Sequence, residues 1–144
     1  LAQRGAGHVN PNPMVGCVIV KDGKIIGEGW HEHIGGLHAE RNAFAHCTED
    51  CTGADLYVTL EPCPMCAGAL INSRMKTVYY GAPDPKAGSC GSLINLFALP
   101  YNHQPALVSG VLEQECADIL RNFFRELRKK RKEIRKLEKS RVEE

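Results

Sequence analysis

Hydrophobic residues along the chain fall first into short runs that are rich in Val and Ile. Residues 14–20 (MVGCVIV) and 24–30 (KIIGEGW) flank the tetrapeptide KDGK, whose Asp-Gly pair is typical of a tight turn between antiparallel strands. We therefore predict a β-hairpin at this place. Three later runs, at 54–60, 76–82 and 105–111, are also short and apolar, and each predicts a further strand.

Segments with helical spacing lie between and after these strands. Residues 38 to about 47 predict one helix, Pro64 is suited to the first position of a second, and 92–99 predict a short third helix. From Leu112 we expect a long helix, and beyond Leu127 its polar end should be solvated or frayed. One face of this helix is apolar, through Cys116, Ile119, Leu120, Phe123, Phe124 and Leu127. A hairpin followed by alternating helices and strands predicts an α/β layered domain with a mixed five-stranded sheet.

The length and composition fit one globular domain. A chain of 144 residues, 43% hydrophobic and 24% charged, predicts a single domain over residues 1–144 with a basic C-terminal helix at 112–140. No apolar run approaches the ~20 residues that span a bilayer, so no membrane partner is expected. The chain opens without Met, and we expect a segment upstream of Leu1. Seven cysteines, an odd number without the pattern of a secreted scaffold, favour a reducing cytoplasmic location.

Charge is distributed unevenly along the chain. Residues 1–120 carry 7 Lys and Arg against 12 Asp and Glu, whereas residues 121–144 carry 11 against 5. Runs of charge are usually solvated surface. A basic helix on an acidic body is, however, also the electrostatic pattern expected for contact with a nucleic-acid backbone. On this second interpretation the candidate RNA-binding residues are Arg121, Arg125, Arg128 and Lys129.

Two cysteines and a histidine predict a metal site. Cys63 and Cys66, in PCPMC, follow a predicted buried strand at the start of a helix, where free N–H groups and the helix dipole lower thiol pKa values. His38 opens another helix and supplies a third ligand of a type that zinc prefers. Three protein ligands leave the fourth tetrahedral position for water, as in catalytic sites, and zinc lowers the pKa of that water toward ~7. Zn²⁺ is therefore the expected cofactor.

Glu40 lies two residues after His38, roughly 200° further round an ideal helix, so it is not expected to bind the same ion. A carboxylate beside activated water can instead carry protons to the substrate, which makes Glu40 the candidate catalytic residue. A structural zinc site and a redox pair are the alternatives to a catalytic centre. Cys47 and Cys51 lie near the end of the predicted helix, where the dipole disfavours thiolates, so we expect loop thiols that bind no metal.

The pattern His-x-Glu followed by Pro-Cys-x-x-Cys resembles the signature of zinc deaminases. The whole chain is similar to the zinc-dependent cytidine deaminase superfamily, which implies a three-layer α/β/α fold. Residues 1–62, with NPNPMVG, GWHEH and HAERNAF, resemble the deaminase domain of the riboflavin biosynthesis protein RibD. From PCPMCAGALINSR through GAPDPKAGSCGS to the basic helix, the chain resembles bacterial tRNA adenosine deaminases.

These two resemblances imply different substrate contacts. In the RibD pattern, the Asn of NPNPMVG and the first His of GWHEH face the substrate; RibD proteins also have a longer insertion between the two cysteines and usually a reductase domain. In the tRNA deaminase pattern, GAPDPKAGSCGS contacts RNA, and backbone N–H groups of residues 89–92 are available to phosphate. The candidate substrate-binding residues are Asn12, His31, Ala39, Pro62, Asp84 and Lys86.

Hydrolytic deamination is the reaction that both resemblances imply. The leading hypothesis is conversion of the wobble adenosine of a tRNA anticodon stem-loop to inosine. One alternative is diaminohydroxyphosphoribosylaminopyrimidine deaminase of riboflavin biosynthesis, which acts on a small pyrimidine nucleotide. Others are a free nucleoside or nucleobase deaminase, an engineered chimera of the two families, and a non-catalytic zinc-stabilised RNA-binding module. The resemblance also implies a homodimer, with the helices near 65–71 and 92–99 as candidate contacts.

Overall fold

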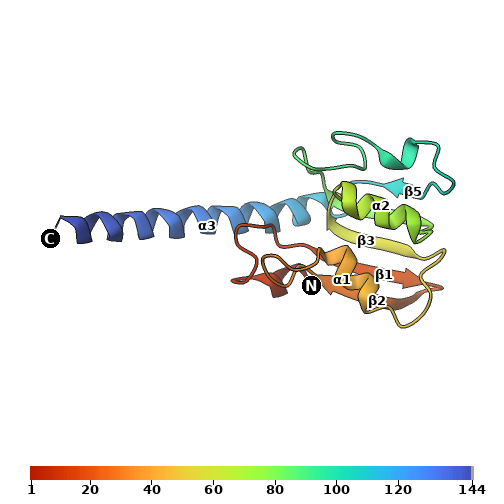
Figure 1. The fold of residues 1–144 in the computed structure, drawn as a ribbon, viewed down its shortest axis with the longest axis horizontal. Coiled ribbons are helices and arrows are strands. Elements are labelled where there is room, and N and C mark those ends of the chain that lie inside the picture. Colours follow the sequence, from red (N-terminus) through yellow and green to blue (C-terminus); the bar gives the residue numbers. More distant parts are fainter. Residues whose placement is uncertain (144) are drawn as a thin grey trace.

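The computed structural model describes residues 1–143, and its centre is a five-stranded mixed sheet in the order β2-β1-β3-β4-β5 (Figure 1). The strands are β1 (Gly16–Lys21), β2 (Lys24–Trp30), β3 (Asp55–Leu60), β4 (Thr77–Ala82) and β5 (Ala106–Val108). β1 pairs antiparallel with both β2 and β3, whereas β3, β4 and β5 run parallel to one another. This confirms the mixed five-stranded sheet that the sequence predicts.

The turn between β1 and β2 is built by its two residues. Lys21 pairs with Lys24, so the connection consists of Asp22 and Gly23, whose φ angles are 51° and 75°. Two successive positive φ angles are the geometry of a type I′ turn, whose twist matches that of antiparallel strands. The Asp-Gly pair therefore produces the hairpin expected from the sequence.

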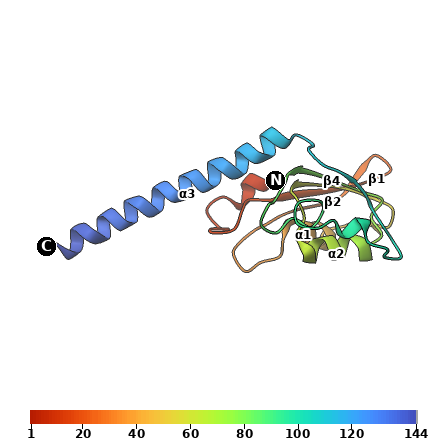
Figure 2. The same cartoon turned by 90° about the horizontal axis from the view of Figure 1, so that it is seen from above.

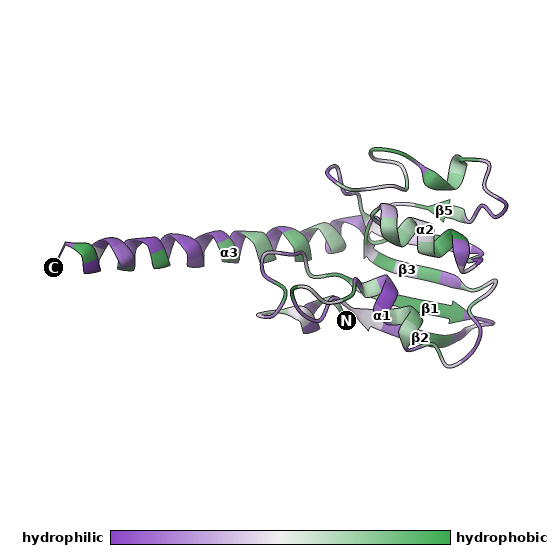
Figure 3. Ribbon diagram, in the orientation of Figure 1, coloured by the Kyte–Doolittle hydropathy of each residue, from purple (hydrophilic) through white to green (hydrophobic). Residues whose placement is uncertain are grey.

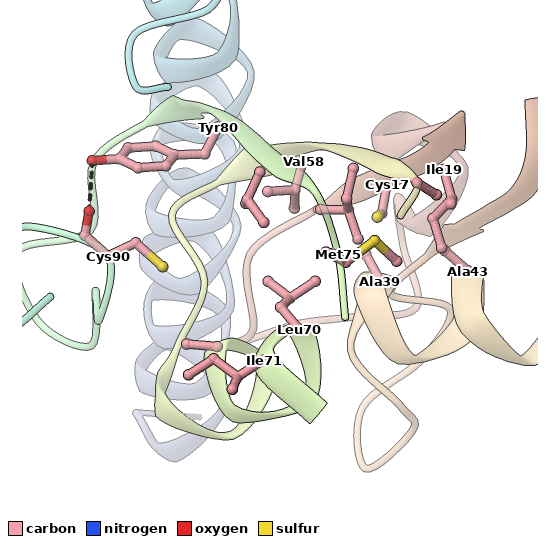
Figure 4. Close-up of a cluster of buried hydrophobic side chains, with 14 of the residues drawn as sticks. Cys17, Ile19, Ala39, Ala43, Val58, Leu70, Ile71, Met75, Tyr80 and Cys90 are labelled. Atoms are coloured by element: carbon pink, nitrogen blue, oxygen red, sulfur yellow. Dashed lines mark hydrogen bonds between the residues drawn. The ribbon is translucent and has the colours of Figure 1, made fainter. Parts of the chain in front are cut away.

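Two helices, α1 (Ala39–Ala45) and α2 (Pro64–Asn72), cover one face of the sheet (Figure 2). α1 approaches β2 closely, because a side chain at Gly29 would overlap the backbone of Ala39 and Ala43. The core lies between these helices and the sheet, and Figure 4 shows part of it. Its largest fully buried side chains include Ile19, Leu56, Leu70 and Val78.

The strand directions bring the starts of both helices to one edge of the sheet. β2 and β3 each pair antiparallel with β1, so they run in the same direction. α1 follows β2 and α2 follows β3, so both helices begin beyond the carboxyl ends of their strands. Open α/β sheets bind ligands at this edge. His38 and Cys63, which precede the two helices, therefore meet although 25 positions separate them.

The long helix α3 (Glu113–Val142) starts against the opposite face of the sheet and projects far from it (Figures 1 and 2). In its first turn the Cys116 side chain lies against Gly81 of β4, and Leu120 and Leu127 are buried. Beyond Leu127 its described residues are all exposed. Figure 3 shows that this distal part is mostly hydrophilic, with isolated hydrophobic positions. The predicted solvated end is therefore present, and it forms a continuous helix.

Two short elements differ from the prediction. The helix expected at 92–99 is a single 3₁₀ turn, η2 (Leu96–Ala98). A helix from residue 92 needs the Leu96 and Phe97 N–H groups for residues 92 and 93, but these groups donate to Ser89 O and Asn95 Oδ1. A second 3₁₀ turn, η1 (Ala2–Gly5), precedes β1 and has no counterpart in the prediction. Within residues 1–143, no helix combines the length and apolar character required to cross a membrane.

Candidate active site

His38, Cys63 and Cys66 converge at the edge where α1 and α2 begin. His38 Nδ1 lies 3.6 Å from Cys63 Sγ and 3.5 Å from Cys66 Sγ. The three ligand atoms lie within 4.8 Å of one another. A tetrahedral zinc ion, with Zn–S of about 2.3 Å and Zn–N of about 2.0 Å, places nitrogen and sulfur about 3.5 Å apart. The three side chains therefore fit zinc, and they leave one tetrahedral position for a further ligand.

The start of α2 stabilises negative charge on sulfur. The hydrogen bond from the Cys66 thiol, together with the backbone N–H groups of Cys66 and Met65 and the nearby His38, lowers the pKa of Cys63 to about 5, although partial burial opposes this shift. The same hydrogen bond raises the pKa of Cys66, which donates it. Because the thiolate is the form that binds metal, the N-terminus of α2 prepares Cys63 for zinc.

Glu40 lies in the first turn of α1 with only 4% of its surface exposed. Burial raises the pKa of its carboxyl, and the Cys63 sulfur adds to the rise, while a backbone hydrogen bond and His38 oppose it. A carboxyl group with a raised pKa beside a metal site is suited to taking up and releasing protons near neutral pH. The arrangement can therefore supply both an activated water molecule and a proton carrier.

A cavity of about 240 Å³ opens beside the three ligands. Glu40 and Glu61 line it, as do four of the predicted substrate-binding residues, Asn12, His31, Ala39 and Asp84. The other two lie outside this lining. The Pro62 side chain is fully buried and its carbonyl accepts a hydrogen bond from the Ser89 N–H at 2.9 Å, and Lys86 is exposed on the surface.

Asn12 and His31 form one wall of the cavity as a hydrogen-bonded pair. His31 is 5% exposed, and its Nδ1 lies 2.9 Å from the carbonyl oxygen of Leu37. Because a carbonyl only accepts, Nδ1 carries the proton, which leaves Nε2 to accept from the Asn12 amide at 3.2 Å. This bond orients Asn12 so that its oxygen remains available to accept a further hydrogen bond.

The loop of residues 84–92 lines the same cavity through Asp84 and Ala87. The sequence predicts that the N–H groups of residues 89–92 are available to phosphate, and this prediction is wrong. Each of the four N–H groups has an acceptor within the protein: Pro62 O, the Glu61 carboxylate, Ile94 O and again the Glu61 carboxylate. Sequence reasoning missed Glu61, whose signal was an acidic residue directly after a buried strand.

The other cysteines contribute no ligand to this group. Cys47 and Cys51 are partly buried, and burial raises the pKa of both thiols, which disfavours the form that binds metal. Cys17 is 1% exposed, in agreement with its expected place in the core. Cys116 is only partly buried, because the first turn of α3 lies at the margin of the sheet.

A stripe of cations follows α3. Spacings of three and four residues place one member on each successive turn of the same helix face. These residues, all exposed and here called the cationic stripe, are Arg121, Arg125, Arg128, Lys132, Arg135 and Lys139. Arg121 pairs with Asp118 at 2.6 Å, and the predicted contact Lys129, which lies beside the stripe, pairs with Glu126 at 3.4 Å. The stripe extends for about 27 Å at 1.5 Å per residue.

The base of α3 lies close to the active site. Phe123 and Leu127 border a groove together with Asn10 and Met14. These two residues flank Asn12, which lines the catalytic cavity. The cationic stripe lies on the opposite side of α3 from the face that borders this groove, and it leads away from the sheet.

Comparison with known proteins identifies the family. Residues 1–82 match the cytidine and deoxycytidylate deaminase zinc-binding region. The tRNA-specific adenosine deaminase of Bacillus subtilis is 46% identical over 136 residues, which cover 85% of this chain and 82% of that protein. The riboflavin biosynthesis protein RibD of Actinobacillus pleuropneumoniae is also 46% identical, over 137 residues that cover 91% of this chain but 36% of that protein.

A solved structure gives a similar result. The diaminohydroxyphosphoribosylaminopyrimidine deaminase and uracil reductase of Thermotoga maritima superposes with a TM-score of 0.74 at 42% identity, covering 90% of this chain and 39% of that one. The chain thus spans little more than a third of its RibD relatives. Both kinds of relative match most of the chain, so the two resemblances overlap and do not divide it at Pro62.

Three observations indicate the same kind of site, a zinc-binding deaminase centre. They are the three convergent ligands, the buried carboxylate beside them and the matched region. The fold is that of cytidine deaminases, with α1 and α2 over one face of the mixed sheet. The chain belongs to the cytidine and deoxycytidylate deaminase family and is a zinc-dependent hydrolytic deaminase.

Proposed function

We propose that the protein deaminates the wobble adenosine of a tRNA anticodon stem-loop to inosine. The observation that carries this proposal is the cationic stripe on α3, which extends for about 27 Å along the side of the helix opposite the groove that Asn10 and Met14 line. A small nucleotide needs no such surface, whereas the phosphates of an RNA stem lie along a line that several cations can follow.

The size of the cavity agrees with a single flipped base. Its volume of about 240 Å³ is below the ~300–1,000 Å³ of pockets that enclose whole drug-sized ligands. An enzyme that acts on a base in a folded RNA extrudes that base into a small pocket and leaves the backbone outside. Arg121, Arg125, Arg128 and Lys129 are then the cations closest to the cavity along the sequence of α3.

Each polar group of the cavity has a role in this proposal. Zinc held by His38, Cys63 and Cys66 supplies the acidity that makes water a nucleophile at neutral pH. Glu40 takes the proton of the attacking water and delivers it to the departing amino group, which leaves as ammonia. Main-chain groups beside Ala39 and Pro62, together with Asp84 in the cavity lining, hold the ring, and Lys86 contacts RNA outside the cavity.

A substrate assay tests the proposal. Zinc-loaded protein is incubated separately with an anticodon stem-loop, the riboflavin pyrimidine intermediate and free adenosine, and ammonia and inosine are measured. We expect inosine in the stem-loop alone. A matched stem-loop with guanosine at the wobble position serves as the control. Turnover of the pyrimidine without turnover of the stem-loop would overturn the proposal.

The Asn12 and His31 pair favours a second candidate, deamination of the pyrimidine nucleotide of riboflavin biosynthesis. Their 3.2 Å contact leaves the Asn12 oxygen directed to accept from a donor, and a diaminopyrimidinone carries several N–H groups. The identity to RibD proteins over most of the chain supports the same candidate. Leu neither donates to His31 nor accepts from a substrate, so this candidate predicts that Asn12→Leu loses pyrimidine turnover.

We further propose that the protein acts as a cytoplasmic homodimer. Exposed apolar side chains gather on α2 and around η2, through Met65, Leu93, Ile94 and Leu99, which are 50%, 63%, 47% and 37% exposed. Seven free cysteines fit a reducing compartment. Sedimentation at micromolar concentration should give twice the monomer mass, and Leu93→Asp together with Ile94→Asp should reduce it to the monomer value.

A further inference from the structure

Glu61, the first residue after β3, is buried with 2% of its surface exposed and forms no ion pair within residues 1–143. Its carboxylate oxygens accept hydrogen bonds from four groups. The donors are the backbone N–H groups of Cys90 and Ser92, each at 3.2 Å, that of Asp84 at 3.4 Å, and the Ser92 hydroxyl at 2.5 Å. All four donors belong to the loop 84–92, so this single loop supplies all four hydrogen bonds to the buried Glu61 carboxylate.

The loop is shaped around this carboxylate. A side chain at Gly88 would overlap the Glu61 carboxylate, so only glycine allows the backbone to approach it. Two further hydrogen bonds hold the loop in place. The Ser89 N–H donates to the Pro62 carbonyl at 2.9 Å, and the Tyr80 hydroxyl donates to the Cys90 carbonyl at 3.4 Å (Figure 4).

The same loop lines the cavity through Asp84 and Ala87, and Glu61 itself borders the cavity. Glu61 lies two residues before the zinc ligand Cys63 and is joined to it by Pro62. A hydrogen-bonded link thus runs from the metal site to the loop that lines the cavity. We propose that Glu61 is a positioning residue, which holds the loop 84–92 at a set distance from the zinc ligands and thereby determines which substrate the cavity admits.

This role differs from that of Glu40. Glu40 lies against the zinc ligands and moves protons, whereas both oxygens of Glu61 are occupied by the loop. A change at Glu61 should therefore weaken substrate binding and raise KM, while a change at Glu40 should lower kcat. Whether substrate binding responds in this way rests on the proposed deaminase function. The attachment of the loop to Glu61 does not.

The variant Glu61→Gln keeps the shape of the side chain and removes its charge. Each oxygen of Glu61 accepts from two donors, so the new NH₂ group must face at least one N–H or O–H donor, whichever way the amide is oriented. We expect at least ten-fold faster hydrogen exchange at the Asp84, Cys90 and Ser92 amides. The amides of β3 at Leu56 and Val58 should be unchanged.

The catalytic half of the test uses whichever substrate the wild-type protein deaminates. We expect Glu61→Gln to raise KM about ten-fold, with kcat within about three-fold of wild type and zinc content unchanged. Ser92→Ala removes one donor and should show the same pattern to a smaller extent. Ser73→Ala, which removes a similar hydroxyl at the end of α2, is the matched control and should leave both constants unchanged.

Three results would overturn the proposal. They are unchanged exchange in the loop, a fall in kcat at constant KM, and loss of zinc from a folded Glu61→Gln protein. Hydrogen exchange needs no substrate. It therefore tests the attachment of the loop to Glu61 even if the protein does not deaminate tRNA. If Glu61→Gln does not fold, Ser92→Ala tests the same hydrogen bonds.

Discussion

The body of the protein, from β1 to β5, and the distal half of α3 are built on different principles. In the body, side chains such as Leu70 and Val78 are fully buried in the core. Functional groups from distant parts of the chain lie close together there. Beyond Leu127 the helix buries no described side chain, and its cations are arranged only by helical spacing. Chemistry at a zinc site requires fixed positions, whereas attraction of a phosphate backbone requires only a dense and correctly spaced charge.

This difference predicts which substitutions alter chemistry, stability or binding. A change in the body should act steeply and at one position. A change in the distal part of α3 should act gradually, in proportion to the charge removed.

The largest effect is expected at the proton carrier. Glu40→Ala should lower kcat by at least 10²-fold, because positioned acid–base groups contribute about 10²–10⁴-fold. Zinc content, measured by atomic emission on the purified protein, should remain at that of wild type. The exposed Glu28→Ala is the matched control and should retain full activity. Loss of zinc from Glu40→Ala would place this residue among the metal ligands.

The next effect concerns stability. Leu70 is fully buried, so Leu70→Ala should reduce the free energy of unfolding by about 2–5 kcal/mol. Leu137 is 63% exposed on α3, and Leu137→Ala should change the free energy of unfolding by less than about 0.5 kcal/mol. Urea unfolding of both variants checks the comparison. A large loss at Leu137 would mean that the distal helix packs against another surface, such as a second subunit.

A smaller effect is expected from the cationic stripe. Replacing Arg125, Arg128 and Lys132 together by Gln should raise the KM for stem-loop RNA about ten-fold and leave kcat unchanged. The slope of log affinity against log salt should fall by about 0.7 for each lost phosphate contact. Lys130, Arg131 and Arg141 lie on other faces of α3, and their triple replacement by Gln is the control for net charge. Equal effects of both triple variants would contradict a specific stripe.

The smallest effect is expected at the loop thiols. Cys47→Ser should leave zinc content and activity unchanged, because the burial that raises the pKa of Cys47 disfavours its thiolate and the zinc ligands lie elsewhere. Cys63→Ser, at a ligand, is the contrasting variant and should lose the metal. A loss of one zinc equivalent from Cys47→Ser would indicate a second metal site.

Elements with local signals follow from the amino-acid sequence alone. The Asp-Gly pair at 22–23 specifies the hairpin turn, and Pro64 after Cys63 specifies the start of α2. The three zinc ligands and Glu40 were also recognisable, because their residue types and spacing are restricted by the chemistry of zinc. The spacing of the cations on α3 follows from the helix repeat alone.

How distant segments act together depends on the three-dimensional fold. Parallel directions of β2 and β3 bring His38 to Cys63, and pairing of His31 with Asn12 orients a side chain from a different segment. The resemblance to tRNA deaminases implies that N–H groups of the loop 84–92 approach phosphate, yet the N–H groups of residues 89–92 donate to Glu61 and other internal acceptors. Because Glu61 and the other internal acceptors already bind these N–H groups, the groups are not available to an external phosphate. No local sequence pattern indicates whether the N–H groups of a loop point into the protein or toward solvent.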